Sequence, residues 1–233
     1  MWRKPFKDVF EWLKNYVRQN ISQTLDDAFG EKIEPRKPTF RFTKEQLEAV
    51  VHKTSLYALR RGVTIRIYKK FKLGYDKKAK EVYFPSFNFK RELIGVTKRR
   101  TDRKIYVNLE GFEKSDWLYG LEHAKKGTLV YIVEGMFDVL RLVSLGYNTV
   151  GTFGAIMSER QAELAIDNFA SVCYIRDRDI AGKKGRNRAF DLISSKLPFY
   201  TTKLLKHRHD VGEMTADEIK RVIKSRYLLI RRK

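Results

Sequence analysis

Apolar and polar positions alternate regularly through the second half of the chain. The run at 129–133 is apolar and rich in β-branched residues, which predicts a buried strand, and apolar residues at helical spacing predict a helix over 136–145. The same alternation continues with strands at 148–153, 171–176 and 202–206 and helices at 158–169, at about 183–196 and after Thr215. The short links between these elements predict an α/β fold with a parallel sheet flanked by helices.

Two of these helices have recognisable starts. Ser158 is followed at three residues by Gln161, and Thr215 by Glu218, which are capping-box patterns.

The first half of the chain has a different pattern. Residues 8–29 place apolar side chains at helical spacing, which predicts a helix, and leave open whether its stripe packs on the protein's own core or on a partner. A Pro-containing linker at 34–38 leads to a second helix, capped by Thr43 and extending to Arg60-Arg61-Gly62. Alternating segments over 63–89, including Ile65, Ile67 and Tyr68, and again at 92–96, predict a small sheet.

These patterns divide the chain into four parts. We expect an N-terminal helix and linker at 1–38, a smaller basic α+β subdomain at 39–127, the α/β domain at 128–225 and a basic tail at 226–233.

The net charge of the chain indicates which class of molecule it binds. The 233 residues are 42% hydrophobic and 33% charged, which is typical of a globular protein. Lys and Arg number 49, and the net charge is +21, a field that attracts polyanions. Nucleic acid is therefore the first candidate partner.

The cysteine count and the hydropathy of the sequence exclude several classes of protein. Cys173 is the one cysteine of the sequence, so the chain can form neither an internal disulfide nor a Cys-rich zinc ribbon. No run approaches the roughly 18 apolar residues of a membrane span, and the N-terminus lacks a signal-peptide pattern. We expect a cytoplasmic protein with no membrane association.

Acidic residues follow two of the predicted strands. Glu134 ends the strand at 129–133, with Asp138 one helical turn later, and Asp177 and Asp179 follow the strand at 171–176. The carboxyl ends of parallel strands meet at one sheet edge, where ligands bind in open α/β folds. Carboxylates gathered there would repel one another unless cations lay between them, so the pattern predicts a divalent metal site.

Clustered cations lie ahead of this domain. Lys98, Arg99, Arg100 and Lys104 follow the strand at 92–96 with few acids among them, and Lys183 lies just after the second acidic pair. Such clusters suit phosphate groups, which they bind without regard to base sequence.

The acidic motifs together resemble a known family. Glu-Gly-x-x-Asp at a strand end, followed at domain scale by Asp-x-Asp, is similar to the Toprim domain of primases, topoisomerases, small nucleases and recombination mediators. The resemblance runs from about 128 to about 224.

More of the chain resembles one branch, the DnaG-type bacterial and phage primases. The segment at 149–154, with Gln161, resembles that family's glycine turn, 177–182 resembles its Asp-x-Asp-x-Ala-Gly, and 206–213 contains a further acid, Asp210. Segments of the first half match in order, at 60–65, 71–75, 82–85, 94–99, 104–108 and 118–124.

The resemblance implies a DNA primase catalytic core, a nucleotidyltransferase that makes short RNA primers on single-stranded DNA from ribonucleoside triphosphates. It implies catalytic roles for Glu134, Asp138, Asp177 and Asp179, and two or more Mg²⁺ or Mn²⁺ ions on Glu134, Asp177, Asp179 and Asp210. Residues expected to contact template or nucleotide are Arg61, Lys98, Arg99, Arg100, Lys104, Asn108 and Lys183.

Two departures from the family shape the expected partners. One cysteine cannot build the family's zinc-binding domain, and the helical bundle expected after the Toprim segment is absent or reduced to residues 215–233, with no helicase region after it. We therefore expect a replicative helicase, and a separate zinc-binding subunit, as partners. The alternatives are a Toprim-type metal-dependent nuclease and a non-catalytic DNA-binding replication accessory; the compactness of the chain hints at a phage origin.

Overall fold

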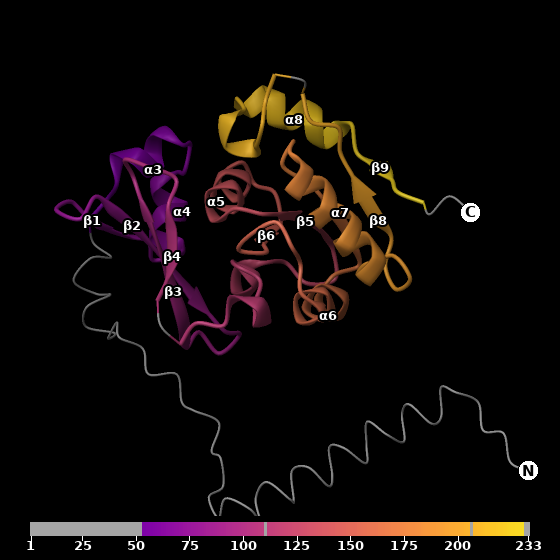
Figure 1. Cartoon of the computed structure of the whole chain (residues 1–233), viewed down its shortest axis with the longest axis horizontal. Helices are drawn as coiled ribbons and strands as arrows, with labels where there is room; N and C mark the ends of the chain where they lie inside the picture. Colours follow the sequence, from indigo (N-terminus) through magenta and orange to yellow (C-terminus); the bar gives the residue numbers. More distant parts are fainter. Residues whose placement is uncertain (1–52, 110, 206, 231–233) are drawn as a thin grey trace, which may run out of the picture. The chain divides into compact units, whose positions relative to one another are not determined.

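The computed structural model describes residues 53–109, 111–205 and 207–230, and within them two sheets are formed (Figure 1). The predicted helix at 8–29 and its linker lie outside the described residues. The first sheet is an antiparallel meander in the order β1-β2-β3-β4. Its elements are α3 (Leu56–Arg60), α4 (Ile65–Lys70), β1 (Gly74–Asp76), β2 (Glu81–Phe87), β3 (Leu93–Arg100) and β4 (Tyr106–Asn108).

The second sheet has the order β6-β5-β7-β8-β9 and is parallel except for β9. Its strands are β5 (Leu129–Val133), β6 (Thr149–Gly151), β7 (Ser171–Tyr174), β8 (Phe199–Thr201) and β9 (Tyr227–Leu228). Its helices are α5 (Met136–Ser144), α6 (Glu159–Asn168), α7 (Ile180–Ile193) and α8 (Ala216–Lys224). Three short 3₁₀ helices are η1 (Lys114–Asp116), η2 (Leu121–His123) and η3 (Val211–Glu213).

Both faces of the second sheet are buried, as the predicted α/β fold requires. Along β5, Tyr131 and Val133 pack with α5 and α8, whereas Val130 and Ile132 pack with α6 and α7. Side chains of a strand alternate between faces, so a continuously apolar strand serves two cores. Helices on both faces leave the carboxyl edge of the sheet free for a site.

Helix α5 also joins the second sheet to the first. The ring of Phe137 on α5 meets that of Phe84 on β2 edge to face, with 4.9 Å between centroids. The backbone N–H of Thr64, at the start of α4, donates to Ser144 Oγ at 3.0 Å. The first sheet therefore shares one hydrophobic core with α5, and this contact fixes its position relative to the carboxyl edge of the second sheet.

Most predicted elements of the second half are confirmed. Both capping boxes form: Ser158 with Gln161 begins α6, and Thr215 with Glu218 begins α8. Among the described residues no helix has the length and apolar character that crossing a membrane requires.

Several boundaries in the first half were wrong. The segment predicted as a strand from Ile65 is helix α4, capped by Thr64, because Val63, Ile67 and Phe71 are buried at a spacing of four. The helix predicted from Thr43 to 61 does not run through 53–55; a new helix, α3, starts after Ser55, which caps it. Residues before 53 lie outside the described part.

Two predictions near the C-terminus also change. The strand predicted at 202–206 lies at Phe199–Thr201 instead, where Phe199 fills the core between α7 and the sheet. The segment assigned to a basic tail contains β9, which pairs antiparallel with β8.

Helix α7 packs closely on the loop between β6 and α6, and Gly185 makes this possible. A methyl group there would overlap the carbonyl oxygen of Ala155. We predict that Gly185→Ala lowers the free energy of unfolding by about 1–3 kcal/mol, although alanine favours helix by about 1 kcal/mol. Urea unfolding measures the change. Asn187→Ala, exposed on the same helix, is the control; equal stability of the two variants would contradict the packing.

Candidate active site

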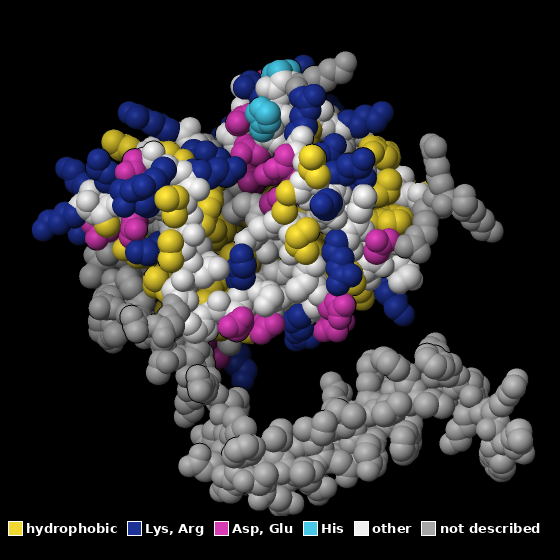
Figure 2. Space-filling view, viewed as in Figure 1, with side chains coloured by type: hydrophobic (Ala, Val, Ile, Leu, Met, Phe, Trp, Pro, Cys, Tyr) yellow, Lys and Arg dark blue, Asp and Glu magenta, His cyan; other side chains and the backbone are white. Residues whose placement is uncertain are grey.

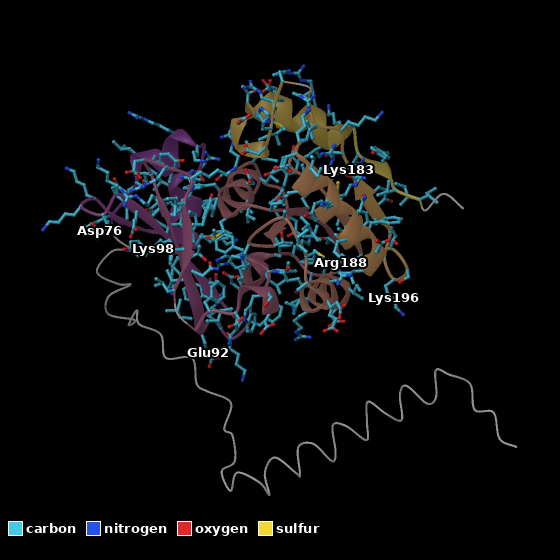
Figure 3. The ribbon with its side chains drawn as sticks, viewed as in Figure 1. Asp76, Glu92, Lys98, Lys183, Arg188 and Lys196 are labelled. Atoms are coloured by element: carbon cyan, nitrogen blue, oxygen red, sulfur yellow. The ribbon has the colours of Figure 1, made fainter. Side chains whose placement is uncertain are left out.

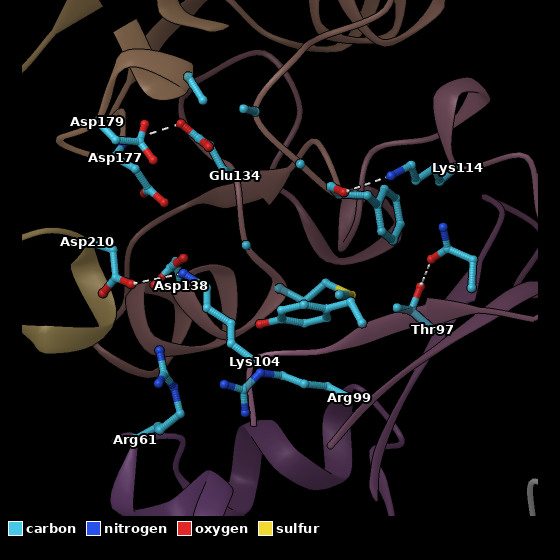
Figure 4. A pocket seen from close by; sticks show the side chains of 18 of the residues that line it. Arg61, Thr97, Arg99, Lys104, Lys114, Glu134, Asp138, Asp177, Asp179 and Asp210 are labelled. Atoms are coloured by element: carbon cyan, nitrogen blue, oxygen red, sulfur yellow. Dashed lines mark hydrogen bonds and ion pairs between the residues drawn. The ribbon is translucent and has the colours of Figure 1, made fainter. Parts of the chain in front are cut away.

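Six acidic residues line one cavity of about 500 Å³ at the carboxyl edge of the second sheet (Figure 4). They come from the turn after β5, the first turn of α5, the turn after β7, and the segment from Asp210 through η3. The residues are Glu134, Asp138, Asp177, Asp179, Asp210 and Glu213. The structure therefore brings together every acid that the sequence singled out.

The two strand ends are joined directly. The backbone N–H of Asp177 donates to Glu134 Oε1 at 3.2 Å, which links the end of β7 to the end of β5. Asp179 caps α7, and its Oδ1 accepts from Gly182 N at 2.6 Å. One oxygen of Asp179 is thus committed to the helix.

Asp138 is the most enclosed of the acids. It lies in the first turn of α5, is 6% exposed, and its Oδ1 has no hydrogen-bond partner among the described residues. Asp210 caps η3 through a bond to Glu213 N at 3.0 Å.

Burial first, and neighbouring acids second, raise the pKa values of three of these acids. Burial, followed by the charges of Asp138 and Glu134, raises the pKa of Asp177 to about 8. Burial and the charge of Asp210 raise the pKa of Asp138 to about 7. Burial, with Asp179 nearby, also raises the pKa of Glu134. This edge therefore disfavours its own negative charge.

Cations from the first half face the acids across the cavity. Arg61, Arg99 and Lys104 line it, together with the neutral amide of Asn108. Lys104 Nζ lies 4.0 Å from Asp210 Oδ2. Figure 2 shows Asp and Glu side chains gathered in the middle of this face, with Lys and Arg on either side.

Aromatic rings hold two of these cations. The Arg99 guanidinium lies over the rings of Tyr57, Tyr106 and Phe137, at 4.9, 5.3 and 5.4 Å from their centroids. Arg61 lies 5.1 Å from the centroid of Phe137. Stacking on rings orients a guanidinium without neutralising its charge, so both cations remain available to an anion.

The structure does not bring Lys98, Arg100 or Lys183 into the cavity lining. The predicted strand at 92–96 extends as β3 to Arg100. The three cations at 98–100 therefore lie within the strand, and their side chains alternate between its faces. Lys98 pairs with Glu81 at 3.1 Å, and Arg100 with Asp102 at 2.7 Å. Figure 3 places Lys98 on the first sheet and Lys183 on α7.

The sequence assignment missed other residues of the cavity, including Lys114, Tyr106 and Thr97. Lys114 Nζ donates to the carbonyl oxygen of Phe153 at 3.4 Å, which places its ammonium group at the rim (Figure 4). Lys114 is a single lysine in a three-residue 3₁₀ helix, and its position just ahead of the 118–124 segment was the only available signal. Tyr106 and Thr97 could have been found from strand alternation around Arg99.

The acids suit a hard divalent cation. Their donors are carboxylate oxygens, and the unpartnered Oδ1 of Asp138 and the raised pKa values both indicate uncompensated negative charge. In the described part of the chain, no three acidic, His or Cys residues are arranged as a complete ligand set. Mg²⁺ commonly takes only one or two carboxylates and completes its shell with water and substrate phosphates, so the residues fit such an ion.

Known proteins share this sequence pattern and this architecture. The family model described as Toprim-like matches residues 131–215. The DNA primase of Clostridium acetobutylicum is 34% identical over 136 residues, covering 54% of this chain and 23% of the relative. The chain spans from about a quarter to less than half of the length of the first curated relatives.

Solved structures extend the likeness beyond the Toprim-like segment. The zinc-binding and RNA polymerase domains of Aquifex aeolicus primase superpose with a TM-score of 0.66 at 24% identity, over 94% of this chain and 70% of that one. The E. coli primase catalytic core gives 0.65 at 17% identity, over 79% of each chain. This is the fold of the DnaG primase catalytic core. In this DnaG-type fold the cavity is lined by residues of both the basic sheet and the Toprim-like sheet.

If divalent metal ions stabilise the carboxylate edge, removing one carboxylate charge there should stabilise the metal-free protein. Asp177→Asn relieves repulsion, so we expect the unfolding midpoint in EDTA to rise by about 2–4 °C, equivalent to about 1 kcal/mol. The same variant should lose most of the stabilisation that Mg²⁺ gives the unsubstituted protein. Scanning fluorimetry in EDTA and in Mg²⁺ measures both effects.

Asp217→Asn is the matched control, because Asp217 is exposed on α8 beside Lys220. It should leave both midpoints nearly unchanged. A lower midpoint of Asp177→Asn in EDTA, or unimpaired stabilisation by Mg²⁺, would contradict the assignment.

Proposed function

We propose that this chain is a DNA primase catalytic core, a nucleotidyltransferase that synthesises short RNA primers on single-stranded DNA. The carboxylate edge of the Toprim-like sheet faces Arg61, Arg99 and Lys104 of the basic sheet across one cavity, and this single arrangement supports the proposal. The primase names of the curated relatives agree with it.

The two sides of the cavity suit the two kinds of charge in the reaction. Triphosphates and the template backbone are polyanions, and they would lie against the oriented guanidinium groups of Arg99 and Arg61. The ammonium groups of Lys104 and Lys114 lie at the cavity and can contact phosphate oxygens, including those of the leaving pyrophosphate.

The acidic side would hold Mg²⁺ or Mn²⁺, most directly through Asp177, Glu134, Asp210 and the free oxygen of Asp179. When bound, such ions supply electrophilic stabilisation of phosphate oxygens and activation of a hydroxyl nucleophile. The bond between Asp177 N and Glu134 Oε1 sets the spacing of the two strand ends. Buried Asp138 would maintain negative potential behind them.

A single incubation tests the proposal. The full chain is mixed with single-stranded DNA, labelled ribonucleotides and Mg²⁺ or Mn²⁺, and both RNA products and template length are followed. Short RNA that depends on template supports primase. Shortened template without RNA would instead support a nuclease. Intact template without RNA would support a non-catalytic accessory, provided that the result is the same when a helicase and a zinc-binding primase subunit are added.

Charge at Asp179 can be removed without removing its structural role. Asparagine also caps helices, so Asp179→Asn should preserve α7 and the fold. We predict a loss of about 100-fold or more in primer synthesis, with unchanged affinity for single-stranded DNA. Primer yield and fluorescence anisotropy measure the two quantities; near-normal yield would rule out a role for this carboxylate.

Position relative to the cavity predicts different roles for two lysines close in sequence. Lys104 lies at the cavity, whereas Lys98 pairs with Glu81 outside its lining. We expect Lys104→Ala to weaken binding of single-stranded DNA and to reduce the slope of log affinity against log salt by about 0.7, the value for one phosphate contact.

Lys98→Ala is the matched control and should leave that slope unchanged. Anisotropy titrations at several salt concentrations distinguish the two variants. Equal effects of both substitutions would show that the cations act by overall charge and not by position.

The proposed function also implies particular substrates and partner proteins. We expect single-stranded DNA and ribonucleoside triphosphates as substrates, with a replicative helicase and a separate zinc-binding subunit aiding processivity and start-site choice. One structural neighbour is the primase fragment of the bacteriophage T7 primase-helicase protein, which superposes with a TM-score of 0.58 at 20% identity.

A further inference from the structure

Gln161 connects the start of α6 to two loops that border the candidate active site. Its side chain is 1% exposed, and its Nε2 donates to the carbonyl oxygens of Lys114, Trp117 and Thr152 at 3.0, 2.8 and 3.1 Å. Its Oε1 accepts from Ser158 N at 3.1 Å, which completes the capping box. An amide group has two N–H hydrogens, so one of them is shared between two carbonyls.

The first of these loops contains Lys114. It includes the short helix η1, which has no side-chain cap. Lys114 is exposed, and its ammonium group reaches the cavity from this loop. The bonds from Gln161 to the carbonyls of Lys114 and Trp117 fix both ends of η1 to α6, and Ser158 Oγ adds a bond to Ser115 O.

The second loop is the turn after β6. Phe153 there has a φ of +58°, a left-handed conformation that is costly for a side chain with a ring. Gln161 binds the carbonyl of Thr152 just before it, and the carbonyl of Phe153 receives the Lys114 ammonium. Both partners of that contact are therefore positioned by the same buried amide.

We propose that Gln161 is a positioning residue that sets the location of the Lys114 ammonium relative to the carboxylate edge. Helix capping alone would require only its Oε1, and the three donor contacts are additional to it. The inference rests on the proposed function insofar as Lys114 acts on a nucleotide, but the positioning itself is a property of the fold.

Substitution can separate the two roles. Gln161→Glu keeps the capping acceptor and removes the amide donors that face three carbonyls, and Gln161→Met removes both roles at similar volume. We expect both variants to lose about 10–100-fold in kcat for primer synthesis, since a displacement of about 1 Å can cost about 100-fold. Affinity for single-stranded DNA should change less than two-fold in the same variants, roughly the precision of such comparisons.

A second measurement does not depend on activity. Hydrogen exchange of the backbone amides at 113–118 should become faster in both variants, because the loop loses its bonds to α6. Asn168→Met is the matched control: Asn168 is a buried amide at the other end of α6, and its Nδ2 donates to Leu164 O within the same helix at 2.8 Å. This control should lower stability to a comparable degree while leaving kcat and exchange at 113–118 unchanged.

The outcomes are distinguishable. Unchanged hydrogen exchange at 113–118 in Gln161→Glu and Gln161→Met would overturn the positioning role. Faster exchange together with a kcat within two-fold of the unsubstituted chain would also overturn it. If the unsubstituted chain makes no primers, the proposed function fails, and the exchange measurement alone still decides whether Gln161 holds the loop.

Discussion

Mutual repulsion among carboxylates at one sheet edge is the constraint on which the site depends. Asp138 and Asp177 have pKa values raised to about 7 and 8 because burial and neighbouring acids disfavour their charge. A fold that only needed stability would not gather such groups. Their presence is explained by a ligand that brings positive charge to this edge. The cations on the opposite side of the cavity supply only part of this positive charge. Lys104 Nζ, for example, lies 4.0 Å from Asp210 Oδ2.

The shared hydrophobic core explains how this edge can face the basic sheet at a defined distance. Helix α5 begins beside Glu134 and includes Asp138, and its apolar face packs on both sheets. Phe137 contacts Phe84 of the first sheet and lies beneath the guanidinium groups of Arg61 and Arg99. One residue thus joins the core to the cations of the site. Changes in the packing of α5 would alter the width of the cavity as well as stability.

How much the sequence could predict depended on the kind of information each residue carries. Glu134, Asp138, Asp177 and Asp179 follow buried apolar strands, so periodicity alone placed them at one edge. Asp210 lies beyond the predicted strand at 202–206 rather than directly at its end, and only the family resemblance indicated it. Lys98 and Arg100 were assigned from charge density, which does not reveal the face of a strand. Lys114 was missed because its position results from long-range bonds to Gln161, 47 residues away, which local patterns cannot show. Ile65 was misassigned because a short amphipathic helix and a strand look alike over six residues.

Anomalous diffraction from crystals soaked with Mn²⁺ and a ribonucleoside triphosphate would locate the metal ions directly. We expect at least one ion bound by two or more of Glu134, Asp177, Asp179 and Asp210, with triphosphate oxygens completing its shell toward Lys104. Triphosphate bound without metal at these carboxylates, or Mn²⁺ bound only elsewhere, would contradict this expectation.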